Sequence, residues 1–342
     1  MQRVGPPPGA PPGPPPLPPG PLPPDVSRGP AINIVGWVGA SICTVFVLLR
    51  LYSRHFITRT LGWSDAIIVF AQVLNIIATA LATVSVHYGT GRHAVHIPLE
   101  NIEPALFYGA IVRPFSITSY ILPKLSVALL IISLMGTQKT GVWFLWSVIV
   151  VLFITSILSF IMLFAQCNPP DHIWKPMEPA MCYPTIVLDS ITYVAGSWSA
   201  FTDLILAVYP VWILRNLQVK KSKKISIMII MGLGFFAMIA AIAKTTQLSA
   251  NNSPDAPYEL FWLFITTYVE TDLVIIAACA PTLPKLFMRL MGKDTELPTG
   301  QSGYGSKKVG QGYKEFDSEN SHSVPLDTIK KKVVISQNSQ MV

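Results

Sequence analysis

Charged residues are scarce in this chain of 342 residues, because Asp, Glu, Lys and Arg together make up only 13% of it, against 51% hydrophobic residues. A soluble helical domain needs helices with one polar face. Stretches such as 225–242 are instead apolar on all sides. The composition therefore argues against a soluble helical domain. We also expect no nucleic-acid partner.

Long polar segments are also missing between residues 31 and 283. Seven apolar stretches of about 20 to 30 residues follow one another there, and each suits a hydrocarbon layer ~30 Å thick at a rise of ~1.5 Å per residue. The sequence thus predicts an all-α membrane protein, a bundle of seven transmembrane helices over residues 31–284. The predicted spans are 31–51, 66–86, 105–134, 142–165, 186–214, 225–248 and 259–283.

Positive charge is unevenly shared between the two sets of connections. Near the span ends, twelve Lys and Arg residues lie on the side of the first, third and fifth connections and of the segment just after the last span, against four on the other side. The twelve are Arg50, Arg54, Arg59, Lys139, Arg215, Lys220, Lys221, Lys223, Lys224, Lys285, Arg289 and Lys293. Cytosolic connections accumulate such residues, so we expect the N-terminus outside and the C-terminus in the cytosol. The basic residues of the fifth connection are Arg215, Lys220, Lys221, Lys223 and Lys224.

Cysteine is rare, with four residues in total. Cys43 and Cys279 fall within predicted spans, whereas Cys167 and Cys182 bracket the fourth connection, on the side expected to be outside. That compartment is oxidising, so these two residues are predicted to form a disulfide that closes a loop of about 16 residues. The alternative is a pair of free thiols in an ordered loop.

The first thirty residues lack the apolar core of a cleavable signal peptide and contain fourteen prolines between Gly5 and Pro30. We expect residues 1–30 to form an extended extracellular arm. After Gly292 the composition becomes polar, with several glycines and serines. Residues 285–342 are therefore predicted to be a disordered cytosolic tail.

Histidine is also rare, and none of the six histidines lies within a predicted span. A seven-span hydrolase typically gathers His and Asp ligands around zinc. His87, His93 and His96 lie near one another in the second connection, but their spacing fits no closed zinc pattern. We expect no metal site, no catalytic residues and no enzymatic activity.

Apart from Arg50 and Glu259 at span ends, seven charged residues nevertheless fall within the predicted spans, where an unpaired central charge costs at least ~2.5 kcal/mol. They are expected to face the bundle interior in two layers. The outer layer holds Arg113, Asp189 and Lys244, and the deeper layer holds Lys124, Asp203, Glu270 and Asp272.

Each layer contains both signs of charge, which indicates pairing between helices. Two interpretations stay open: a polar cavity that binds a ligand or passes an ion, and a salt-bridge network that fixes helix register. Prolines in the third and fifth spans favour a cavity, because they kink the helices and free backbone carbonyls. The candidate pairs are Lys124 with Asp203 or Glu270, and Asp189 with Arg113 or Lys244.

Short motifs recur in a fixed order along the chain. They comprise Arg50, Tyr52, Arg54, Leu61, Gly62, Trp63 and Asp65; Tyr88, Gly89, Gly91 and His93; Lys124 and Ser126; Cys167, Pro169, Trp174 and Cys182; Asp203, Pro210, Leu217 and Gln218; and Glu270, Ile275, Cys279, Pro281 and Leu283. With these residues the chain resembles, from about Ile34 to Pro284, the fungal rhodopsin-like domain family of seven-span membrane proteins. The resemblance implies a fungal membrane protein of receptor-like type.

Several features depart from that family or from related seven-span proteins. Ser64 stands where a second acidic residue is frequent, Lys244 stands where arginine is common, and no cysteine-rich domain precedes the bundle. A retinal Schiff base needs a buried lysine amine, and the seventh span, 259–283, contains no lysine. The acidic-Arg-Tyr and Asn-Pro-x-x-Tyr motifs of classical heptahelical receptors are absent too. We therefore expect no retinal and no other cofactor.

The expected function is that of a receptor-like or sensory protein of the plasma membrane. It would hold an unknown ligand in an outer or mid-membrane pocket, and the 215–224 loop and the tail would contact a cytosolic signalling partner. The same basic loop could instead only bind anionic membrane lipids. The alternative for the whole protein is a transporter or channel that uses the buried charges, although no internal repeat pairs the spans.

Overall fold

The computed structural model describes residues 2–4, 24–59, 61–135, 139–176, 179–214, 221–248 and 255–282. The predictions for most of the proline-rich arm, for Arg215 and Lys220, and for the tail lie outside these residues. The predictions for the side chains of Lys221, Lys223 and Lys224 also lie outside what the structure describes.

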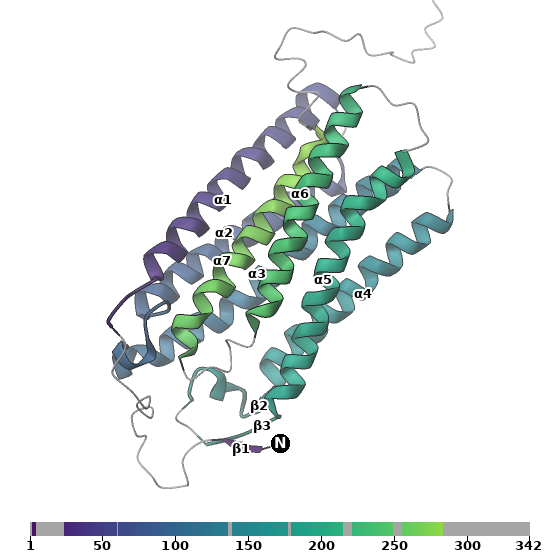
Figure 1. Cartoon of the computed structure of the whole chain (residues 1–342). Helices are drawn as coiled ribbons and strands as arrows, with labels where there is room; N and C mark the ends of the chain where they lie inside the picture. Colours follow the sequence, from purple (N-terminus) through teal and green to yellow (C-terminus); the bar gives the residue numbers. More distant parts are fainter. Residues whose placement is uncertain are drawn as a thin grey trace, which may run out of the picture. The chain divides into compact units, whose positions relative to one another are not determined.

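The described chain is mainly helical. Six of its helices are long and apolar enough to cross a membrane, and α6 contributes a shorter apolar helix, Gly232–Thr246. The helices are α1 (Gly29–Tyr52), α2 (Trp63–Tyr88), α3 (Leu99–Met135), α4 (Lys139–Ala165), α5 (Thr185–Leu214), α6 (Lys221–Thr246) and α7 (Ala256–Cys279) (Figure 1).

The helices bury one face and expose large apolar side chains on the other. In α4, Leu145 and Leu152 are fully buried, whereas Ile154 and Ile157 are 58% and 55% exposed. Such exposure opposes folding in water but suits contact with lipid chains. The side-chain pattern is therefore that of a multi-pass membrane protein.

Helices α3 and α7 lie at the centre of the packing. Helix α3 contacts α2, α4, α5 and α7, and α7 contacts α1, α2, α3 and α6 (Figure 1). A buried apolar cluster that includes Ile121, Ile149, Leu206 and Ile275 joins these helices. Side chains that point between α3 and α7 are thereby kept away from lipid.

A small sheet was not anticipated by the all-α prediction. Strands β1 (Gln2–Val4), β3 (Ala180–Cys182) and β2 (Cys167–Asn168) form an antiparallel sheet in the order β1-β3-β2. Cys167 lies opposite Cys182 in the β2 and β3 pair, and the two residues form a disulfide. The predicted bond is confirmed.

Candidate functional site

A buried ionic cluster occupies the space between α3, α5, α6 and α7. Lys124 of α3 is fully buried, and its Nζ lies 2.9 Å from Asp203 Oδ2 and 3.1 Å from Glu270 Oε1. The same ammonium group donates a hydrogen bond of 2.7 Å to Ser199 Oγ. One lysine is thus held by groups from two other helices, α5 and α7.

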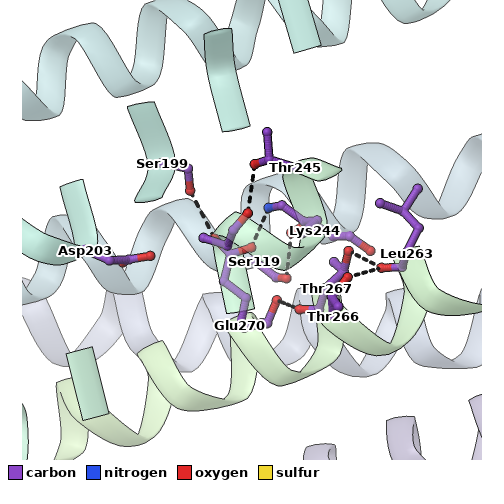
Figure 2. A network of polar contacts seen from close by, with 12 residues as sticks. Ser119, Ser199, Asp203, Lys244, Thr245, Leu263, Thr266, Thr267 and Glu270 are labelled. Atoms are coloured by element: carbon purple, nitrogen blue, oxygen red, sulfur yellow. Dashed lines mark hydrogen bonds and ion pairs between the residues drawn. The ribbon is translucent and has the colours of Figure 1, made fainter. Parts of the chain in front are cut away.

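Lys244 of α6 completes the cluster. It forms an ion pair with the second carboxylate oxygen of Glu270, and its Nζ lies 4.1 Å from the centre of the Tyr120 ring. Ser199 donates a hydrogen bond of 3.0 Å to Glu270 Oε1 (Figure 2). Two ammonium groups therefore face two carboxylates. This balance suits a low-dielectric interior, where an uncompensated charge is costly.

Helical spacing and one glycine bring these groups together. Ser199 and Asp203 are four residues apart on α5, so both face the same side. A Cβ atom at Gly196 would lie 2.5 Å from Thr245 Oγ1. The glycine therefore allows α5 and α6 to approach closely beside Lys244.

The structure rearranges the two predicted layers. Lys244, assigned to the outer layer, contacts Glu270 of the deeper layer. Asp272, assigned to the deeper layer, instead contacts Cys43 and Asn75 on α1 and α2. Two residues along a helix differ by about 200° in direction, so Glu270 and Asp272 face opposite sides of α7 although they lie at similar depth.

A cavity of about 780 Å³ adjoins the cluster. Most of its lining is apolar and comes from α3, α5 and α7, with Arg113, Asp189 and Lys244 as charged groups. Thr90 and Ile173, from the connections after α2 and α4, also line it. Its size and lining resemble those of pockets for small organic ligands.

The segment after α2 ties the cavity rim to neighbouring helices. Gly91 N donates to Pro257 O, and Gly91 O accepts from Arg28 N, both at 2.8 Å. Gly91 has a φ of 93°, and a Cβ atom there would lie 2.6 Å from Gly29 N. A glycine is therefore required at position 91, because its φ is positive and because the backbone of Gly29 lies so close. It joins the starts of α1 and α7.

The sequence did not reveal a second buried ion pair. Arg50 Nε donates a 2.8 Å hydrogen bond to Asp65 Oδ1, and Arg50 Nη1 donates to Ala278 O. Arg50 and Asp65 are 1% and 2% exposed. The sequence identified Arg50 as a charge that sets orientation and as a family motif residue, but not as part of an ion pair. The signal available was Asp65, an acidic residue at the start of an apolar span.

Together, the helices, the apolar cavity and the neutral cluster define a multi-pass integral membrane protein. The profile of the fungal rhodopsin domain matches residues 49–289. The chain belongs to this family, which confirms the resemblance inferred from the motifs.

Two curated relatives come from fungi. "Fugralins biosynthesis cluster protein 2" of Gibberella zeae is 24% identical over 322 residues, which cover 85% of this chain and 78% of that protein. "Satratoxin biosynthesis SC1 cluster protein 4" of Stachybotrys chartarum is 27% identical over 127 residues, 36% of this chain and 44% of that protein. No solved structure matches the chain.

Proposed function

We propose that this protein is a receptor-like sensor that binds a small, mostly apolar molecule in the cavity beside Lys244. The observation that carries the proposal is that Lys244 belongs to both the cavity lining and the ionic cluster. A ligand that touches Lys244 therefore acts on a network with members on four helices. The relatives named for biosynthesis clusters favour a small biosynthetic product as the ligand.

The proposed coupling runs through the Lys244 and Glu270 pair. A hydrogen-bond acceptor on the ligand competes with Glu270 for the ammonium group and favours a different position of α6 relative to α7. Such a ligand shifts the equilibrium only by its difference in affinity for the two positions. Helix α6 begins at Lys221 and therefore includes the last four residues of the predicted 215–224 loop, so movement of α6 would displace them. We propose this loop, together with the tail, as the docking surface for a cytosolic partner.

The proposed topology has seven spans, with α6 as the additional one, in the plasma membrane. The N-terminus and the disulfide loop then lie outside, and the 215–224 loop and the tail lie in the cytosol, as the distribution of Lys and Arg requires. An epitope tag after Val342 should be stained only after permeabilisation, whereas a tag before Gln2 should be stained on intact cells. Staining of the C-terminal tag on intact cells would contradict this topology.

Filling the cavity should weaken ligand binding. Ala195 lines the cavity, and Ala195→Phe places a ring in it. The neighbouring Val194 is 60% exposed on the outer face of α5, so Val194→Phe adds the same ring outside the cavity. We expect native mass spectrometry to detect a bound small molecule after incubation with an organic extract of the source fungus. Binding should persist in Val194→Phe and fall at least tenfold, about 1.4 kcal/mol, in Ala195→Phe.

Circular dichroism of both variants serves as the folding control for this experiment. Equal occupancy in folded Ala195→Phe and in the unchanged protein would show that the molecule binds elsewhere. No bound molecule in the unchanged protein would contradict a product of the fungus as the ligand.

The alternative function is transport, which the buried charges favour. In a transporter the ionic cluster would open to form a path across the membrane, whereas in a sensor it would stay closed. Flux measurements distinguish the two proposals. We propose neither enzymatic activity nor retinal binding. A retinal imine needs a buried lysine in the seventh span, and residues 259–283 contain none.

A further inference from the structure

A separate polar site lies between α1, α2 and α7, on the side of α7 that faces away from the ionic cluster. Asp272 Oδ1 lies 3.2 Å from Cys43 Sγ and 3.4 Å from Asn75 Nδ2. A Cβ atom at Gly39 would overlap Asp272 Oδ2, so the carboxylate lies directly against the backbone of α1. The contacts of Asp272 thus hold its carboxylate at the α1 and α2 side of α7.

This carboxylate differs from three other carboxylates of the bundle in its counter-charge. Asp65, Asp203 and Glu270 each pair with an arginine or lysine. Within the described ranges, no basic side chain forms an ion pair with Asp272. Its polar neighbours there are a thiol and an amide, both neutral. A charged carboxylate inside a membrane span is costly unless a cation balances its charge or a proton neutralises it.

A second observation is the amide of Gln72, one helical turn before Asn75 on α2. Gln72 Nε2 donates hydrogen bonds of 2.9 Å to Ala40 O and Thr44 Oγ1 on α1. Its Oε1 is buried and accepts no hydrogen bond, and the residue is 4% exposed. A buried oxygen without a partner is unfavourable. Because Gln72 is one helical turn from Asn75, which contacts Asp272, this oxygen points to a missing donor or cation.

We infer that Asp272 binds a monovalent metal cation, sodium, with the buried amide oxygen of Gln72 as a further ligand. One carboxylate balances one positive charge, so a monovalent ion leaves the site neutral. Carboxylate and amide oxygens are hard ligands that favour hard cations over transition metals. The bound ion would join α1, α2 and α7. This inference departs from the sequence-based expectation of no metal site and is independent of the proposed ligand cavity.

Thermal unfolding of the full chain in lipid nanodiscs tests the site. The melting temperature is measured in sodium chloride and in choline chloride at equal concentration, so that ionic strength stays constant. Because an ion bound to the folded state stabilises it, we expect a saturable rise of about 3 to 6 °C when sodium reaches ten times its Kd. Asp272→Asn should remove this rise. Equal melting temperatures of the unchanged protein in both salts would overturn the inference and leave a proton as the balancing charge.

Two further variants keep the test decisive. Glu259→Gln removes an exposed carboxylate from the same helix and should retain the full sodium response. Gln72→Met keeps Asp272 but removes one oxygen ligand, and it should raise the sodium concentration needed for half of the response by about tenfold. If Asp272→Asn does not fold, this shift in Gln72→Met supports the site. An unchanged response in Gln72→Met, or a full response in folded Asp272→Asn, refutes it.

Discussion

Replacing Lys124 with methionine is expected to lower the free energy of unfolding by about 3 to 5 kcal/mol. The substitution keeps most of the side-chain volume but removes the ammonium group that lies 2.9 Å from Asp203 and 3.1 Å from Glu270. Lys244 alone then faces two buried carboxylates. The loss should be measurable as a shift in the denaturant midpoint in detergent micelles, together with a lower folded yield.

A double-mutant cycle separates charge imbalance from loss of packing. Lys124→Met combined with Asp203→Asn leaves the neutral pair of Lys244 and Glu270, so the double variant should be more stable than Lys124→Met alone. The control cycle combines Lys124→Met with Asp272→Asn, which lies on the other side of α7, and these two losses should add. Additive losses for Lys124 and Asp203 as well would show that the two residues do not share a site.

Replacing Arg50 with methionine should cost about 3 kcal/mol or more, because Asp65 is then buried without its main partner. Arg50→Lys should recover only part of the loss. A guanidinium group can donate to Asp65 and to Ala278 O at the same time, whereas an ammonium group lacks this fixed planar geometry. The free energy of unfolding of the three proteins gives the comparison.

Arg54→Lys provides the matched control for this series. Arg54 Nε lies 3.7 Å from Asp65 Oδ1, and the Arg54 side chain is 18% exposed. Its replacement is therefore expected to cost less than ~1 kcal/mol. If Arg50→Lys proved as stable as the unchanged protein, the hydrogen bond to Ala278 O would not contribute to stability.

The helices could be predicted well where apolar runs determine them. The predicted span 186–214 corresponds to α5, Thr185–Leu214, and the predicted span 31–51 corresponds to α1, Gly29–Tyr52. The start of α3 was predicted six residues too late, because the polar Glu100 and Glu103 belong to a helix that extends beyond its apolar segment. Hydropathy marks the edge of the lipid-facing segment, whereas backbone hydrogen bonds decide where a helix begins.

The candidate site could be predicted only in part. Charged residues within spans are rare, so Lys124, Asp203, Lys244 and Glu270 stood out from the sequence. Counting from the span ends gave their depth but not their direction around the helix, so Asp272 was grouped with Glu270. Ser199 and Tyr120 also escaped notice, because hydroxyl and aromatic residues are too common in membrane helices to be distinctive.

Flux through proteoliposomes tests most directly whether the protein is a sensor with a closed cluster or a transport path. The purified chain is reconstituted with a pH-sensitive dye trapped inside, and proton and potassium flux are recorded under an imposed gradient. We expect flux through the proteoliposomes to be no higher than through protein-free liposomes, because the paired lysines and carboxylates hold α3, α5, α6 and α7 together. Flux above that level that disappears in Lys244→Met would contradict the account and assign the cluster to transport.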